Sequence, residues 1–279
     1  MRICYILLSP TFGMHQYTAD LANRAADAGH EVHLVTTKRA PRDRYAPQVI
    51  IHTPVLTTNT GLSREGLTGR GLAAVHRTVH HIHPDLVHFT GPHLWNTLLA
   101  RALTDRHVPT IHTLHDLDPH SGTSYARYGF LLKFWNWLTI RAVDHVLVHN
   151  RSYRNRLLDW GVPWSRITFT TLLHLFLSHT HLASVSRQVD AVQYEPWALF
   201  FGRLERYKGI DDLLTACEMM EDISPNGPKV VLAGPGNISN LWAGPLPEQL
   251  ELRNRLIADE EAIDLFRRCG LVVLPYRTP

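Results

Sequence analysis

The fold class is decided by one stretch, Ala198-Leu-Phe-Phe-Gly-Arg-Leu-Glu-Arg-Tyr-Lys-Gly-Ile-Asp-Asp-Leu-Leu214. Residues 198–201 are apolar and predict a buried strand, which ends at Gly202. Gly209 then opens an amphipathic pattern that predicts a helix over residues 209–222. A strand that leads through a glycine turn into a helix is the repeating unit of parallel α/β sheets, so this stretch predicts such a sheet.

Two cations in the turn, Arg203 and Lys208, predict a site for an anion. The unpaired backbone N–H groups and the dipole at a helix N-terminus favour negative charge. An Arg guanidinium can bind two phosphate oxygens at once, and a Lys ammonium adds a mobile point charge. Each cation alone would be an ordinary residue of a basic turn, whereas the whole arrangement predicts a site for a diphosphate.

Short apolar runs alternate with helical patterns along the remaining sequence, which predicts an α/β protein with two doubly wound parallel sheets. The expected strands are residues 2–8, 31–36, 86–89, 110–114, 145–149, 167–170, 198–201, 229–233, 250–253 and 271–274. The helices with clear ends are expected at residues 16–28, 209–222 and 259–269. Neither period is clean between residues 171 and 197, which indicates a connection between domains.

The chain of 279 residues is longer than one typical domain. We expect an N-terminal domain at residues 1–172, a connection at 173–196 and a second domain at 197–279. The last expected strand stops close to Pro279, with no helix to cover it, so the second sheet would leave apolar surface exposed. This predicts that the second domain is incomplete and that the chain is truncated at its C-terminus relative to its functional parent.

Cysteine usage and hydropathy predict a cytoplasmic protein. Cys4, Cys217 and Cys269 lie far apart in expected strands or helices, which indicates buried free thiols in a reducing compartment rather than disulfides or a metal site. No run approaches the ~20 apolar residues that span a bilayer. Residues 3–8 lack a basic flank and a cleavage site, so they predict a first strand rather than a signal peptide.

Charge is distributed unevenly: residues 1–170 carry net positive charge and residues 171–279 carry net negative charge. A basic N-terminal half suits peripheral contact with an anionic membrane or an acidic acceptor, and ordinary surface scatter explains it equally well. Aromatic residues within 128–140 also allow contact at the inner membrane face, although a core helix explains them better. The cations are dispersed and no recognised motif accompanies them, which argues against a nucleic-acid partner.

The phrase F-G-R-L-x-x-x-K-G at residues 201–209 resembles a segment of retaining GT-B glycosyltransferases of the glycosyltransferase family 4 type. Gly29-His30-Glu31-Val32 resembles the family's G-H-E-V phrase, which ends one helix and begins the next strand. The resemblance covers almost the whole chain and implies the GT-B fold, two Rossmann-like domains that face a cleft. It implies transfer of a hexosyl unit from a nucleoside diphosphate sugar to a saccharide, lipid-linked or small-molecule acceptor, with retention of anomeric configuration.

The resemblance also implies roles for individual residues. Arg203 and Lys208 would stabilise the charge on the departing diphosphate, and His115 would position the donor sugar. His115 follows the expected strand 110–114, at the carboxyl edge where ligands bind in such sheets, and Asp116 could orient it. The residues implied to bind the donor are Gly13, Gly202, Arg203, Lys208, Gly234, Gly236, Arg255 and Tyr276, and those implied for the acceptor are Thr11, Phe12, His15 and Asp116.

The sequence departs from the family pattern at two places. Only Gly13 stands where the family usually has a Gly-Gly pair, so the backbone is expected to approach the donor phosphates less closely. The family's later pair of glutamates, which grips the ribose and the donor sugar, does not occur before Pro279. We therefore expect this chain by itself to lack those contacts.

The resemblance implies an enzyme that needs neither a cofactor nor a metal. Asp116 and Asp118 imitate an Asp-x-Asp metal motif, but GT-B enzymes generally work without a bound metal. One alternative is a nucleotide-sugar 2-epimerase of the same fold, and another is a non-catalytic nucleotide-sugar or partner-binding protein, if the chain natively ends at Pro279. An NAD-dependent dehydrogenase does not fit, because no G-x-G-x-x-G follows the first strand.

Overall fold

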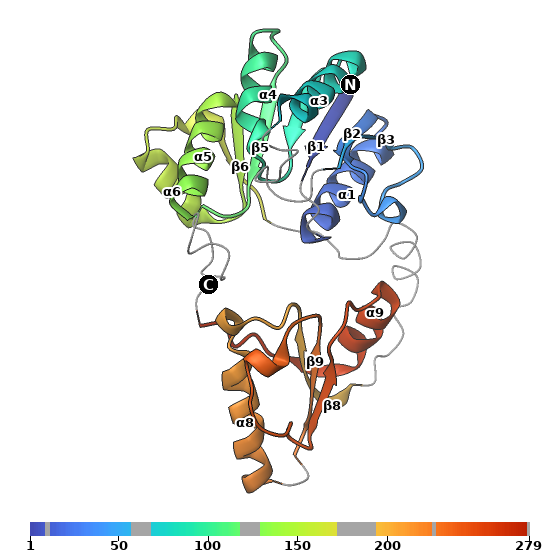
Figure 1. Cartoon of the computed structure of the whole chain (residues 1–279), viewed down its shortest axis with the longest axis vertical. Coiled ribbons are helices and arrows are strands. Elements are labelled where there is room, and N and C mark those ends of the chain that lie inside the picture. Colours follow the sequence, from blue (N-terminus) through green and yellow to red (C-terminus); the bar gives the residue numbers. More distant parts are fainter. Residues whose placement is uncertain (9–11, 57–67, 118–128, 172–193, 225–226, 278–279) are drawn as a thin grey trace. The chain divides into compact units, whose positions relative to one another are not determined.

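The computed structural model describes residues 1–8, 12–56, 68–117, 129–171, 194–224 and 227–277, without the side chains of 12 and 129–132. These residues form two compact units, unit 1 up to residue 171 and unit 2 from residue 194 (Figure 1). The expected domain limits, at residues 172 and 197, lie at or beside residues outside the described ranges, so they stay a prediction. The incompleteness of the second domain also stays a prediction.

Unit 1 contains a seven-stranded sheet in the order β3-β2-β1-β4-β5-β6-β7, and every pairing is parallel. Its elements are β1 Arg2–Leu7, α1 Phe12–Asp27, β2 Glu31–Thr37, β3 Ile50–Val55, α3 Gly69–Ile82, β4 Leu86–Phe89, α4 Trp95–Thr104, β5 Thr110–Leu114, α5 Gly129–Ala142, β6 His145–Val148, α6 Arg151–Asp159 and β7 Ile167–Phe169. Short 3₁₀ helices occur at Arg42–Arg44 and Trp164–Arg166.

Both faces of this sheet are buried, as the continuous apolar strands predict. In β1, Cys4 and Ile6 point to one face, where they pack with residues of α3 and α4. Ile3 and Tyr5 point to the other face, where they pack with residues of α1. The chain runs from β1 to β2 and β3 on one side and then returns to β4 on the other, so the strand order reverses between β1 and β4.

The prediction for helix α1 was wrong at its N-terminus, because the helix begins at Phe12 and not at residue 16. His15, Thr18 and Ala22 are all buried and recur at helical spacing, so His15 adds a further turn to the inward face. At the other end Gly29 has φ 83°, and this left-handed glycine leads into β2 as the sequence predicts.

Strand β3 is not among the strands that the sequence predicts. It contains Pro54, which lacks an N–H group, and it pairs only with β2 at the edge of the sheet. Proline is tolerated at an edge because no second neighbour needs that donor. The edge position explains both the strand and the weakness of its sequence signal.

Unit 2 contains a four-stranded parallel sheet in the order β10-β9-β8-β11. Its elements are β8 Glu195–Phe201, a 3₁₀ helix at Arg206–Lys208, α8 Ile210–Ile223, β9 Lys229–Ala233, a 3₁₀ helix at Ile238–Asn240, β10 Leu250–Arg253, α9 Asp259–Arg268 and β11 Cys269–Val272. The core packs apolar residues of α8, among them Ile210 and Leu214, against Phe200 and Leu232 of the sheet. Strand β11 begins two residues earlier than expected, because Cys269 already pairs with Glu195.

The three cysteines are free and buried, as the sequence predicts. None of the helices in the described ranges combines the length and the apolar content needed to cross a membrane. Helix α5, which holds part of the aromatic stretch, buries Ile140 and donates a hydrogen bond from Trp135 Nε1 to the Leu94 carbonyl (2.7 Å), whereas Phe134 is 46% exposed. The helix packs on unit 1 as the core interpretation predicts.

Candidate functional site

Three turns of unit 2 lie side by side at the carboxyl edge of its sheet. The register of β8, β9 and β10 aligns their last residues. The Gly202 N–H donates to the Ala233 carbonyl (2.9 Å), and the Gly234 N–H donates to the Arg253 carbonyl (3.1 Å). The turns at 202–204, 234–236 and 254–255 therefore form one edge, where parallel sheets bind their ligands.

The glycines of this edge are required by contacts between the turns. Gly202 has φ 141° and Gly234 has φ 144°, in a region that side chains other than glycine rarely adopt. A side-chain carbon on Gly234 would lie 2.0 Å from the Gly202 carbonyl oxygen, and one on Gly236 would lie 2.5 Å from Leu204 Cβ. Gly234 and Gly236 are thus needed for the packing of one turn on the next, and their predicted role in binding the donor stays a prediction.

Arg203 projects from this edge, with 71% of its side chain exposed. Its Nη1 lies 3.3 Å from Glu205 Oε1, a long contact that leaves the guanidinium accessible. An open pocket of about 380 Å³ lies beside it, lined by Arg203, Leu204, Glu205, Pro235, Gly236 and Asn237. The pocket combines a cation with a close-packed glycine turn, which suits an anionic ligand.

Lys208 is half-buried close to Gly202 and two aromatic rings. Its Nζ lies 5.8 Å from the ring centroid of Tyr207 and 5.5 Å from that of Tyr276. Burial lowers the pKa of its ammonium group; Glu205 opposes this effect and Arg203 adds to it. Tyr276 follows β11, so the structure brings two predicted donor residues, Lys208 and Tyr276, together at the point where the strand order reverses between β8 and β11.

The N-terminus of α8 already carries negative charge. Gly209 precedes the helix with φ 67°, and Asp211 and Asp212 occupy its first turn. Arg277 pairs with both carboxylates, through Nη2 to Asp211 (3.1 Å) and through Nε to Asp212 (2.6 Å). The helix dipole is thus offset by the chain's own acids, so we assign the predicted anion site to the turns around Arg203 rather than to the helix end.

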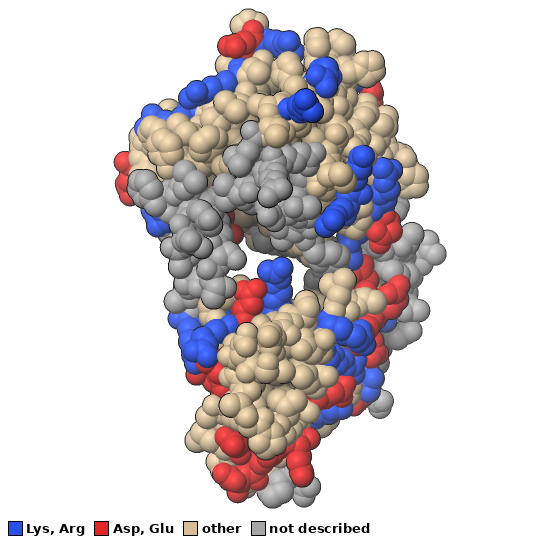
Figure 2. Space-filling model, viewed as in Figure 1, with Lys and Arg blue, Asp and Glu red and all other residues tan. Residues whose placement is uncertain are grey.

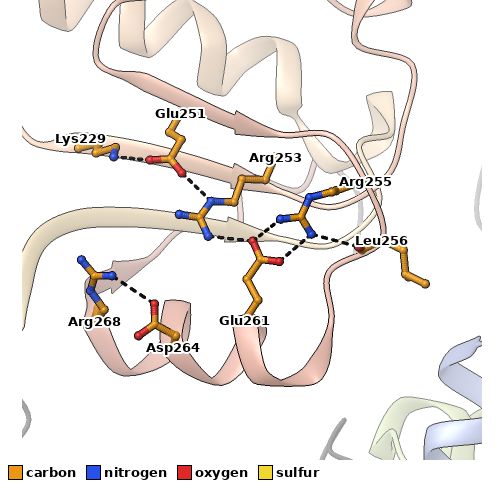
Figure 3. Close-up of polar contacts among 8 residues, drawn as sticks. All are labelled: Lys229, Glu251, Arg253, Arg255, Leu256, Glu261, Asp264 and Arg268. Carbon is orange, nitrogen blue, oxygen red and sulfur yellow. Dashed lines mark hydrogen bonds and ion pairs between the residues drawn. The ribbon is translucent and has the colours of Figure 1, made fainter.

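Arg255, a predicted donor residue, is engaged by a carboxylate of α9 (Figure 3). Its Nη1 and Nη2 lie 2.6 and 2.8 Å from the two oxygens of Glu261. Arg253 binds the same carboxylate through Nη1 (2.8 Å). The sequence places Arg255 near the donor, but the partner Glu261 depends on how α9 packs at the end of β10.

In unit 1, His115 lies at the carboxyl edge of β5 within a cluster of aromatic side chains. Its Nε2–H donates to the Thr90 carbonyl (2.9 Å), and its ring centroid lies 4.7 Å from that of Tyr17 and 5.5 Å from that of His149. Thr90 follows β4, next to the reversal of strand order. The position matches the predicted ligand edge, and the contact with the donor sugar stays a prediction.

The remaining predicted residues of unit 1 have different surroundings. His15 is 1% exposed, and its Nδ1 lies 2.8 Å from the hydroxyl of Tyr45. Gly13 lies in the first turn of α1, and a side-chain carbon there would meet open space. Asp116 is exposed and its carbonyl accepts from Asn136 Nδ2 (3.3 Å). Thr11, Asp118 and the side chain of Phe12 lie outside the described residues, and all the acceptor contacts stay predictions.

Figure 2 shows Lys and Arg at several separate places on the visible face of unit 1. On the visible face of unit 2, carboxylates gather near the end of α8, which carries Glu218 and Asp222. Among the described residues, no three His, Cys, Asp or Glu side chains gather where they could hold a metal ion. Membrane contact and metal independence both stay predictions.

The buried histidines of unit 1 make its stability depend on pH. Burial is the main cause that lowers the pKa of His88 to about 3 and that of His112 to about 4. Below about pH 6.5 the unfolded chain binds protons that the folded unit does not bind. We therefore expect the free energy of unfolding to be highest above that pH. It should fall by up to about 1.4 kcal/mol per pH unit for each histidine as the pH decreases towards 4.

Thermal unfolding of His88→Gln between about pH 4 and 7 checks this expectation. The variant should lose stability less steeply than the wild type on acidification, because it lacks one group that titrates. His81→Gln, on the exposed face of α3, is the matched control and should keep the wild-type slope. Equal slopes for all three proteins would show that His88 does not cause the pH dependence.

A family model supports the resemblance of the sequence to glycosyltransferases of family 4. The model described as Glycosyltransferase Family 4 matches residues 13–170. No curated protein matches the sequence significantly.

Several solved structures have a similar fold. HepE from Anabaena in complex with UDP and glucose has a TM-score of 0.65 and 16% identity, covering 100% of this chain and 75% of that one. UDP-GlcNAc 2-epimerase from Neisseria meningitidis bound to UDP-GlcNAc has a TM-score of 0.62 and 13% identity, covering 98% of this chain and 77% of that one. An alpha-glucosyltransferase in complex with UDP and DNA has a TM-score of 0.59 and 16% identity, covering 98% of this chain and 71% of that one.

These likenesses confirm the predicted fold class, GT-B with two Rossmann-like parallel sheets. At such low identity they show the fold alone. The family model shows more, because the residues that it matches, 13–170, are over half of the 279 in the chain. The chain belongs to Glycosyltransferase Family 4.

Proposed function

We propose that the protein transfers a hexosyl unit from a UDP-linked sugar to an acceptor hydroxyl, with retention of the anomeric configuration. The observation that carries this proposal is the edge of unit 2 where Arg203 stands exposed beside the packed turns of Gly202 and Gly234. UDP is the expected nucleotide because HepE and the alpha-glucosyltransferase of similar fold are complexes with UDP.

In the proposed reaction the bond between the anomeric carbon and the diphosphate breaks, and the acceptor oxygen bonds to that carbon on the same face. The proton of the acceptor hydroxyl passes to the departing diphosphate. Arg203 stabilises the negative charge that grows on this leaving group, and Lys208 adds a second positive charge close to Gly202. His115 positions the donor sugar, and the acceptor is a saccharide, a lipid-linked sugar or a small molecule in the cytoplasm or at the inner membrane face.

A second candidate function is 2-epimerisation of a UDP-sugar. The similar fold of the Neisseria meningitidis enzyme bound to UDP-GlcNAc favours it. Both candidates need a site for the diphosphate, so the residues of unit 2 have the same role in each. The two differ in whether an acceptor is consumed.

The test is incubation of the chain with UDP-glucose and UDP-GlcNAc, with and without a panel of sugar and lipid-linked acceptors. We expect UDP release that depends on an acceptor, and a product whose anomeric proton coupling matches that of the donor. A product with the opposite anomeric configuration would contradict retention. A 2-epimer formed without an acceptor would replace transfer with the second candidate.

A further inference from the structure

The turn at residues 234–236 is held from both sides. The Leu204 N–H donates to the Pro235 carbonyl (3.0 Å), and the Gly236 N–H donates to Asn254 Oδ1 (2.9 Å). A side-chain carbon on Gly236 would lie 2.5 Å from Leu204 Cβ, so the turn has no space to shift towards Leu204. The place of Gly236 thus depends on one neighbouring backbone and on the side chain of Asn254.

Asn254 is fixed in turn through both of its neighbours in sequence (Figure 3). Arg253 and Arg255 bind one carboxylate, that of Glu261, with distances of 2.8 Å from Arg253 and 2.6 and 2.8 Å from Arg255. In Figure 3 the Glu261 side chain rises from the start of α9 and points between the two guanidinium groups. A single carboxylate of α9 therefore holds the side chains on both sides of Asn254.

The ion pairs continue across the sheet. Arg253 Nε lies 2.5 Å from Glu251 Oε1, and Glu251 also pairs with Lys229 of β9. Hydrogen bonds from Arg255 are the main cause that lowers the pKa of Glu261, so this carboxylate is ionised at neutral pH. One exposed ion pair contributes little to the free energy of unfolding. Carboxylates that are shared between several cations nevertheless restrict where each side chain can lie.

We propose that Asn254 and Glu261 are positioning residues for the donor, an inference that rests on the proposed function. Gly236 lines the pocket beside Arg203, and neither Asn254 nor Glu261 does. Glu261 holds the side chains on both sides of Asn254, and Asn254 fixes the Gly236 amide. The wall of the pocket therefore has its shape before a ligand arrives, which strengthens binding because the turn need not be ordered at that moment.

Two measurements on the whole chain test the proposal: amide hydrogen exchange of Gly236 by NMR without ligand, and calorimetric titration with UDP. For Asn254→Ala we expect faster exchange of Gly236 and weaker UDP binding, each by roughly three- to tenfold, the usual effect of losing one hydrogen bond. Glu261→Gln should change both in the same direction by less, because the amide oxygen keeps part of the contact.

Two further variants show whether the effects come from the hydrogen bond between Asn254 and Gly236. Asn254→Asp keeps an acceptor oxygen and should restore the slow exchange of Gly236. Asp264→Asn is the matched control, because Asp264 pairs with Arg268 on the same helix (3.2 Å), away from the turn. It should leave both the exchange of Gly236 and the UDP affinity as in the wild type.

Unchanged exchange of Gly236 in Asn254→Ala would overturn the proposal. Faster exchange with unchanged UDP affinity would overturn the positioning role and leave a hydrogen bond of structural value only. Absence of UDP binding by the wild-type chain would overturn the proposed function and with it the positioning role. The exchange rate needs no ligand, so it would still show whether Asn254 holds Gly236, and the two failures can be told apart.

Discussion

Replacing Arg203 with alanine is expected to lower the rate of sugar transfer by about 10²–10³-fold, the usual loss when one charge-stabilising contact is removed. The side chain is 71% exposed and holds Glu205 at the long distance of 3.3 Å, so its removal leaves the fold intact. Because the guanidinium is proposed to act on the leaving group, the KM of the acceptor should change little. The initial rate of UDP release from UDP-glucose or UDP-GlcNAc, followed over a range of donor concentrations, measures the effect.

Arg206→Ala is the control for loss of positive charge. Arg206 lies in the same turn, and its Nη2 donates to the Asn240 carbonyl (3.3 Å) rather than facing the pocket beside Arg203. We expect this variant to keep most of the activity. Equal losses in both variants would reduce the role of Arg203 to general attraction of anions, and unchanged kinetics in Arg203→Ala would remove its role in the reaction.

The second large effect is expected for Gly234→Ala, which should destabilise unit 2 and abolish nucleotide binding. The new side-chain carbon would lie 2.0 Å from the Gly202 carbonyl oxygen, and φ is 144°. Strained backbone of this kind costs roughly 1–3 kcal/mol before any clash is counted, so we expect a loss of about 3 kcal/mol or more. For a unit of this size the melting temperature should fall by roughly 10 °C or more.

Gly244→Ala provides the matched comparison in the same unit. A side-chain carbon there would lie 3.4 Å from Trp242 Nε1, an ordinary contact, and we expect stability near that of the wild type. Differential scanning calorimetry with and without UDP checks both variants. A Gly234→Ala protein that melts like Gly244→Ala and still binds UDP would show that the two turns do not depend on this close approach.

Much of the fold could be predicted because the buried parallel strands are short runs rich in apolar residues. The runs at Leu86–Phe89, Thr110–Leu114 and Lys229–Ala233 are strands with the predicted limits. Edge strand β3 was missed because Pro54 and polar neighbours mask it. Helix α1 was predicted too short because His15 appears polar in the sequence but is buried in the structure.

The candidate site could be predicted in part. The stretch from Gly202 to Lys208 and the turn after β9 were identified because local sequence specifies a strand, a glycine turn and a cation. Asn254 contacts Gly236, and Glu261 contacts Arg253 and Arg255, only because the strands lie in the order β10-β9-β8-β11. No local sequence pattern predicts that order. For the same reason the sequence did not show that the predicted donor residue Arg255 is held by a carboxylate from α9.

The carboxyl edge of unit 2 is proposed to bind a nucleoside diphosphate. Calorimetric titration of the chain with UDP, GDP, ADP and dTDP tests this proposal most directly, with Arg203→Ala titrated in parallel. We predict that UDP binds at one site and that Arg203→Ala loses this binding. Absence of binding to all four nucleotides by a chain shown to be folded, or UDP binding that is unchanged in Arg203→Ala, would contradict the claim.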